Sequence, residues 1–145
     1  MRIRPSTPAD SQRAIEIWCA AVDTTHDFLT PEDRAAIERE VRAFLPGAPL
    51  WLAVDENDRP LAFMLLDGAK MEALFVDPAV RGRGVGRALV EHALSLHPIL
   101  TTDVNEQNGQ AVGFYKRLGF VAIGRSVTDG QGRPYPLIHL QLAKA

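Results

Sequence analysis

The chain is poor in cysteine, in long apolar runs and in excess charge of either sign. Its one cysteine, Cys19, excludes an internal disulfide framework and cannot form a cysteine-based zinc site by itself. Cys19 lies in the apolar segment 15–22, which favours packing as a small hydrophobe over a nucleophilic role. No segment approaches the ~20 apolar residues of a membrane span, and residues 1–5 lack the apolar core of a signal peptide. We therefore expect a cytoplasmic protein.

The charge balance narrows the choice of partners. A net charge of −2, from 16 basic and 18 acidic residues, offers no broad positive surface to a nucleic-acid backbone. We expect neither a nucleic acid nor a membrane as partner. The histidines lack the spacing of a metal site, so no metal is expected. The 145 residues, 46% of them hydrophobic, suit a single domain over residues 1–145.

A glycine-rich run, residues 81–86, is the most informative feature that is present. It follows the apolar stretch 74–76 and precedes a helix-patterned stretch, 87–96. Glycines allow several backbone N–H groups to converge on one point, and a helix start adds partial positive charge there. Three arginines concentrate further positive charge at this position: Arg81, Arg83 and Arg87. The run is typical of a site for a phosphate-bearing ligand.

Spacing excludes two common phosphate loops. A P-loop requires lysine directly after its last glycine, where this chain has Arg87. A dinucleotide fingerprint requires a third glycine, but counting from Gly82 or Gly84 places Arg87 or Leu89 there. The missing lysine also disfavours a nucleotide-binding switch.

The remaining pattern is arginine, two residues, glycine, one residue, glycine, at Arg81, Gly84 and Gly86. It resembles the pyrophosphate loop of the GNAT superfamily of acetyl-CoA-dependent N-acetyltransferases. A second segment matches the second coenzyme A element of that family at Asn108, Ala111, Phe114, Tyr115, Leu118, Gly119 and Phe120. Both motifs occur in the family's order and at its separation, so the chain is identified as a member.

The resemblance implies an α/β (α+β) fold: a mixed, mostly antiparallel sheet of about seven strands, flanked by about four helices, with splayed fourth and fifth strands. Local patterns agree with it. Strands are predicted at 2–5, 50–54, 61–66, 71–76, 99–104, 120–124 and 137–142, and helices at 10–22, 31–44, 85–96 and 111–118. The second to fourth strands should form an antiparallel meander.

The resemblance also implies the cofactor, with acetyl-CoA as acyl donor and coenzyme A as product. Backbone groups of the fourth strand would hold the pantetheine arm, and N–H groups of the loop the pyrophosphate. The expected contacts are Leu74, Phe75, Val76, Arg81, Gly82, Arg83, Gly84, Val85, Gly86, Arg87, Asn108 and Tyr115. Asn108 has two interpretations that stay open, a contact with the pantetheine or a simple helix cap.

Direct transfer to a primary amine needs a proton acceptor, because an alkylammonium with a reference pKa of ~10.4 is protonated at neutral pH. Glu72 matches the family's base position and would act alone or through water; it could instead face solvent or an arginine. Tyr115 matches the tyrosine proposed to protonate the departing thiolate, and could otherwise be one member of an apolar stripe.

The sequence says least about the amine that accepts the acetyl group. In the family, the segment that joins the first two helices walls the acceptor side, and it corresponds here to residues 23–29. We expect His26 and Phe28, with Glu72, to contact the acceptor, although His26 could simply bond within its loop. The amine could belong to a small molecule, a peptide N-terminus or a protein lysine. An acyl-CoA-binding sensor with little or no catalysis is the alternative function, and the protein is expected to be a monomer or a homodimer.

Overall fold

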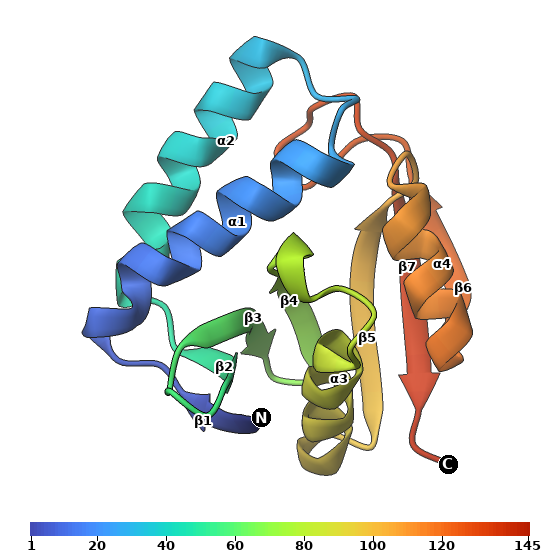
Figure 1. The fold of residues 1–145 in the computed structure, drawn as a ribbon. Helices are drawn as coiled ribbons and strands as arrows, with labels where there is room; N and C mark the ends of the chain where they lie inside the picture. The colour runs from blue at the N-terminus through green and yellow to red at the C-terminus, as the bar shows by residue number, and fades with distance from the viewer. The chain divides into compact units, whose positions relative to one another are not determined.

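A computed structural model describes residues 1–145, and the chain divides into two compact units. The N-terminal unit holds residues 1–65 and 73–90, and the C-terminal unit holds residues 66–72 and 91–145. Seven strands follow the order β1-β2-β3-β4-β5-β7-β6, and four α-helices accompany them (Figure 1). This confirms the predicted mixed sheet of the GNAT fold. No helix combines the length and the apolar character that a membrane crossing requires.

The elements fall close to their predicted positions. The strands are β1 Arg2–Pro5, β2 Leu50–Val54, β3 Pro60–Asp67, β4 Lys70–Val76, β5 Ile99–Asn105, β6 Val121–Ser126 and β7 Leu137–Ala143. The α-helices are α1 Ser11–Thr25, α2 Pro31–Phe44, α3 Val85–Leu96 and α4 Gly109–Leu118, and short 3-10 helices lie at Pro8–Asp10, Leu45–Gly47 and Pro78–Val80.

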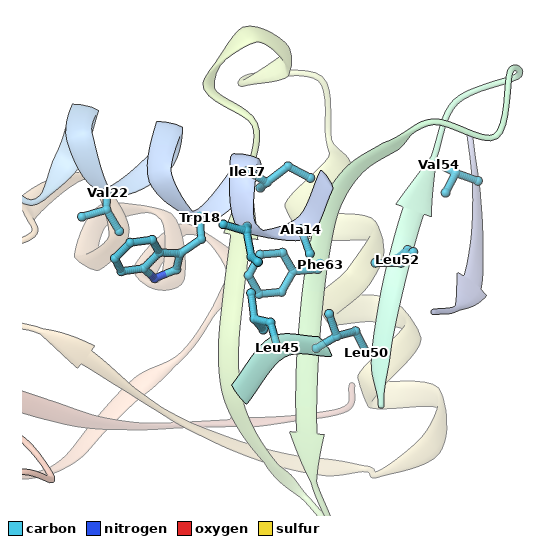
Figure 2. Close-up of a cluster of buried hydrophobic side chains, with 10 residues drawn as sticks. Ala14, Ile17, Trp18, Val22, Leu45, Leu50, Leu52, Val54 and Phe63 are labelled. Atoms are coloured by element: carbon cyan, nitrogen blue, oxygen red, sulfur yellow. The ribbon is translucent and has the colours of Figure 1, made fainter. Parts of the chain in front are cut away.

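The N-terminal unit is built around the side chains that α1 turns toward β2 and β3. β1 pairs antiparallel with β2, and β2 with β3; the pairing of β2 with β3 confirms that part of the predicted meander. Figure 2 shows Ile17 and Trp18 of α1 gathered with Leu45, Leu52 and Phe63 in one apolar cluster, all of them buried. Burial of such side chains stabilises the unit by roughly 1.5–3 kcal/mol each.

The same cluster anchors the carboxyl half of β4. Phe75 packs against it, with its ring centroid 5.5 Å from that of Phe63. Ala73 is also partly buried there. The strand that leads into the glycine-rich run is therefore fixed by packing before the run begins.

The C-terminal unit is a small sheet covered by α4. β7 pairs antiparallel with β5 and β6, so that Asp103 and Gly124 both lie opposite His139. The start of β4 joins the same unit through a parallel ladder, Lys70 with Thr101 and Met71 with Thr102. A register shift between Ala122 and Gly124 marks a bulge in β6.

Several boundaries differ from prediction by one to three residues, and two of these differences have a clear local reason. α1 continues to Thr25, three residues past the predicted end, because the Thr24 and Thr25 hydroxyls donate to the Ala21 carbonyl and satisfy it within the last turn. β6 starts at Val121, because the Phe120 N–H donates to the Tyr115 carbonyl at 3.0 Å and closes the end of α4 after the left-handed Gly119, with φ of 103°.

Candidate functional site

The glycine-rich run forms an open cradle at the start of α3. Gly82 and Gly84 both have φ of 77°, in the left-handed region where other residues are strained. A Cβ at either glycine would have no heavy atom within 4 Å, so the backbone there faces open space. α3 begins at Val85, and the Ala88 N–H donates to the Gly84 carbonyl at 3.0 Å. The loop therefore presents backbone at a helix N-terminus, a geometry that suits a phosphate group.

The arginines of the loop are exposed, as recognition of a polyanion from solvent requires. Arg81, Arg83 and Arg87 are all solvent-accessible. Arg81 also makes a side-chain hydrogen bond: its Nη2 donates to Thr24 Oγ1 of α1 at 2.7 Å. That contact fixes one end of the loop against the last turn of α1, where the acceptor segment 23–29 begins.

Asp77 sets the direction in which the chain enters the loop. Its Oδ1 accepts the Ala79 N–H at 3.0 Å, and its Oδ2 accepts from Arg13 Nη2 at 2.6 Å. Although burial opposes the change, these bonds to Ala79 and Arg13 lower the pKa of Asp77, so the carboxylate stays charged. The turn from β4 into the cradle is thus held by an ion pair.

The predicted cofactor contacts divide between the two units. Leu74, Phe75 and Val76, half-buried on β4, belong to the N-terminal unit together with residues 81–87 and the segment 23–29. Glu72, Asn108 and Tyr115 belong to the C-terminal unit.

Tyr115 is buried, with 6% of its surface exposed, between two aromatic rings. The Phe114 and Phe120 ring centroids lie 5.2 and 5.1 Å from its own. Burial raises the pKa of Tyr115 strongly, against the smaller opposite effect of a hydrogen bond with Thr102. The phenol is therefore protonated at neutral pH and able to donate.

Thr102 is a contact that sequence reasoning did not single out. Its Oγ1 donates to the Met71 carbonyl at 2.8 Å and also bonds with Tyr115. The hydroxyl thus ties the tyrosine of α4 to β4 and β5 within the C-terminal unit. The sequence carries no signal for it, because threonine is common in strands and the contact depends on the pairing of distant residues.

Asn108 caps α4. Its Oδ1 accepts the Ala111 N–H at 3.2 Å, and the residue is 7% exposed. The cap, one of the two interpretations of this residue, is thus present in the structure.

Glu72 is exposed, and its charged neighbour is a lysine rather than the arginine considered above. Its Oε1 lies 3.9 Å from Lys70 Nζ, which is 3.1 Å from Asp103 Oδ2. The bond to Asp103 raises the pKa of Lys70, so the lysine is cationic. A carboxylate in this setting can accept a proton from solvent or from a ligand.

His26 and Phe28 lie together in the acceptor segment. Their ring centroids are 5.2 Å apart, and Nδ1 of His26 shares a hydrogen bond of 2.7 Å with Thr25 Oγ1. Burial lowers the pKa of His26, with Asp27 opposing the change, so the imidazole is neutral at neutral pH. His26 therefore forms a hydrogen bond within its own segment, which was the simpler of its two interpretations.

Comparison with known proteins assigns the class. Residues 46–122, more than half of the chain, match the family model of the acetyltransferase (GNAT) domain. The chain therefore belongs to the GNAT acetyltransferase family, and it is an enzyme, an N-acetyltransferase that moves an acetyl group to an amine. This decides against the binding module that the sequence left open.

Named relatives are similar over nearly the whole chain. The peptidyl-lysine N-acetyltransferase YjaB of Escherichia coli is 60% identical over 138 residues, which cover 95% of this chain and 94% of that protein. The solution structure of apo YjaB from the same organism has a TM-score of 0.95 and 58% identity, covering 99% of this chain and 98% of that one. A more distant acetyltransferase, yncA of Salmonella typhimurium, solved with acetyl-CoA, shares the fold at a TM-score of 0.66 and 21% identity, over 100% of this chain and 94% of that one.

Proposed function

We propose that this N-acetyltransferase takes its acetyl group from acetyl-CoA and delivers it to the side-chain amine of a lysine in a protein or peptide. The identity of 60% with a peptidyl-lysine N-acetyltransferase, over almost the full length of both chains, carries the proposal. The two units would act as one GNAT domain over residues 1–145; the family match supports this, since it runs across residues of both.

The cradle fits the diphosphate of the proposed donor. The open backbone at Gly82 and Gly84 leaves room for phosphate oxygens, and the exposed arginines of the loop would balance their charge. Main-chain groups of Leu74, Phe75 and Val76 would bind the pantetheine arm, and Asn108 is proposed as a further contact of the cofactor. When bound, acetyl-CoA supplies the acetyl group as a thioester.

Two side chains would move protons. Glu72, directly or through a water that it orders, accepts the proton of the lysine ammonium and leaves a neutral nucleophile. Tyr115 donates its phenolic proton to the departing thiolate. The protonated state of Tyr115 at neutral pH and the exposure of Glu72 support these roles. No covalent intermediate on the protein is required.

The acceptor segment would receive the lysine side chain. Phe28 offers an apolar surface for the methylene stem, since a lysine buries its stem while its ammonium stays polar. A neutral His26 does not repel the incoming cation, which fits the lowered pKa of this residue. Its ring already lies against that of Phe28.

The test is acetyl transfer by wild type and by Tyr115→Phe, measured as thiol release with lysine peptides whose N-termini are blocked. Wild type should acetylate the lysine. Tyr115→Phe should bind acetyl-CoA with similar affinity, because the ring and its packing remain, and lose about 100-fold in kcat, the lower range for a proton donor. The same assay is run with two other kinds of acceptor: peptides that have a free N-terminus but no lysine, and small amines. Turnover confined to those amines would contradict a lysine acceptor.

A further inference from the structure

Three side chains of the C-terminal unit are joined end to end by short hydrogen bonds. Ser126 Oγ lies 2.7 Å from His139 Nε2, and His139 Nδ1 lies 2.6 Å from Asp103 Oδ1. They come from the neighbouring strands β6, β7 and β5. The order hydroxyl, imidazole, carboxylate is that of a proton relay.

The chemistry of the three groups fixes the direction of the relay. An ionised carboxylate only accepts hydrogen bonds, so the proton of a neutral imidazole is on Nδ1, toward Asp103. Nε2 then carries the lone pair and accepts from the Ser126 hydroxyl. Although burial opposes the change, bonds from His139 and Lys70 lower the pKa of Asp103, which therefore remains a carboxylate.

The strands are shaped to hold the ring. A Cβ at Gly124 would lie 3.3 Å from His139 Cδ2, so glycine at this position leaves space for the imidazole. The bulge of β6 lies directly beside it, between Ala122 and Gly124. The side chains of His139 and Asp103 are 32% and 28% exposed, so the relay is accessible from solvent.

An ion pair with Lys70 links Asp103, the carboxylate end of the relay, to the carboxylate proposed above as base. Lys70 Nζ lies 3.1 Å from Asp103 Oδ2 and 3.9 Å from Glu72 Oε1. Strand alternation turns Glu72 and Asp103 away from the side of Met71 and Thr102, both of which are buried. Within the C-terminal unit, His139 is thus linked to Asp103 and, through it, to Lys70 and Glu72.

We propose that His139 is a second proton acceptor for the amine, reached through the hydroxyl of Ser126; the inference rests on the function proposed above. One proton passes from the acceptor ammonium to Ser126 Oγ as the Ser126 proton passes to His139 Nε2. The amine is left with its lone pair, and the positive charge moves to the imidazolium, where Asp103 offsets it. Imidazole is the side chain best matched to such a transfer near neutral pH.

The test compares His139→Gln and Ser126→Ala with His97→Gln, a histidine that lies outside the relay just after α3. The measurement is kcat/KM for a lysine peptide between pH 6 and pH 10. His139→Gln should lose about 10- to 100-fold at pH 7, and the loss should shrink toward pH 10, as the amine deprotonates unaided. Ser126→Ala should shift the profile in the same direction, and His97→Gln should follow wild type.

Chemical rescue separates proton transfer from support of the sheet. In His139→Ala, added imidazole should restore part of the lost rate, while acetyl-CoA affinity and the thermal midpoint show whether the variant is folded. A profile of His139→Gln and Ser126→Ala equal to wild type would overturn the inference and leave the proposed function intact. A loss that is the same at every pH and is not rescued would also overturn it. Absence of lysine acetylation by wild type would instead contradict the proposed function.

Discussion

At the residue scale, the role of Glu72 is decided by what surrounds its carboxylate. Its Oε1 lies 3.9 Å from Nζ of Lys70, which also pairs with Asp103, and the Glu72 side chain is 38% exposed. Such a loose pair holds a carboxylate weakly, since an exposed ion pair contributes ~1 kcal/mol or less. The carboxylate of Glu72 is therefore only loosely paired and accessible from solvent.

Replacing Glu72 by glutamine should lower kcat/KM for a lysine peptide at pH 7 by about 10-fold or more, because the amide cannot accept the ammonium proton. The deficit should diminish toward pH 10, where more of the amine is neutral without help. Glu56→Gln, in the turn between β2 and β3, is the matched control and should behave as wild type. A deficit independent of pH would assign Glu72 a structural role through Lys70.

The sequence indicated the candidate residues that belong to a local motif. It did not indicate side chains whose contacts join separate strands. Tyr115 and Asn108 were indicated because their segment is continuous in the chain, and the α4 cap was one of the two interpretations of Asn108. The pair of Asp103 and His139 spans 36 positions and forms only when β5 meets β7. No local pattern in the sequence could name this partner of His139.

At the element scale, the loop before α3 shows how far spacing alone can determine structure. Glycines two residues apart, directly before a helical stripe, predicted a turn into a helix, and α3 begins at Val85 as expected. The left-handed φ at Gly82 and Gly84 explains why those positions are glycine. The openness of the cradle, in contrast, depends on packing of β4 and α1 and required the structure.

Gly84→Glu should abolish binding of acetyl-CoA, because it places a side chain and a negative charge in the cradle. The positive φ adds backbone strain of about 1–2 kcal/mol, so a control must carry the same strain. Gly132→Glu provides it, with φ of 80° and equally open space, in the loop between β6 and β7. Calorimetric titration should show wild-type affinity for the control. Equal affinity for Gly84→Glu would contradict the assignment of the cradle.

At the scale of the whole molecule, the sequence predicted where the strands lie in the chain better than which strands pair with one another. Hydrophobic alternation is local, so each strand was found within two residues of its ends. The insertion of β7 between β5 and β6 was not predicted, because no residue pattern in the sequence indicates it. Each such pairing joins residues that are far apart in the chain, for example Leu100 and Leu142. Its register is specified by the burial of apolar side chains on one face of both strands.

The acid stability of the fold should depend on Asp10. Both of its oxygens accept from the guanidinium of Arg4, at 2.9 and 3.0 Å, and Oδ2 also accepts the Thr7 N–H. The bond to Arg4 is the main cause that lowers the pKa of Asp10 from 3.8 to about 2. A carboxylate whose pKa is lower in the folded than in the unfolded protein stabilises the fold fully at pH values above the unfolded pKa. This contribution is lost as the pH falls from about 4 to about 2.

Asp10→Asn should therefore reduce the free energy of unfolding by about 2 kcal/mol at neutral pH, and this difference from wild type should shrink as the pH falls below 4 and disappear near pH 2. Urea unfolding across this range measures it. Asp58→Asn is the comparison, because Asp58 is the other carboxylate that contacts Arg4 and its side chain is 53% exposed. This variant should lower the free energy of unfolding by less than about 1 kcal/mol. A gap between Asp10→Asn and wild type that stays constant from pH 7 to pH 2 would show that the ion pair does not govern acid unfolding. A gap that closes would place this link between β1 and the start of α1 among the interactions that hold the fold together at neutral pH.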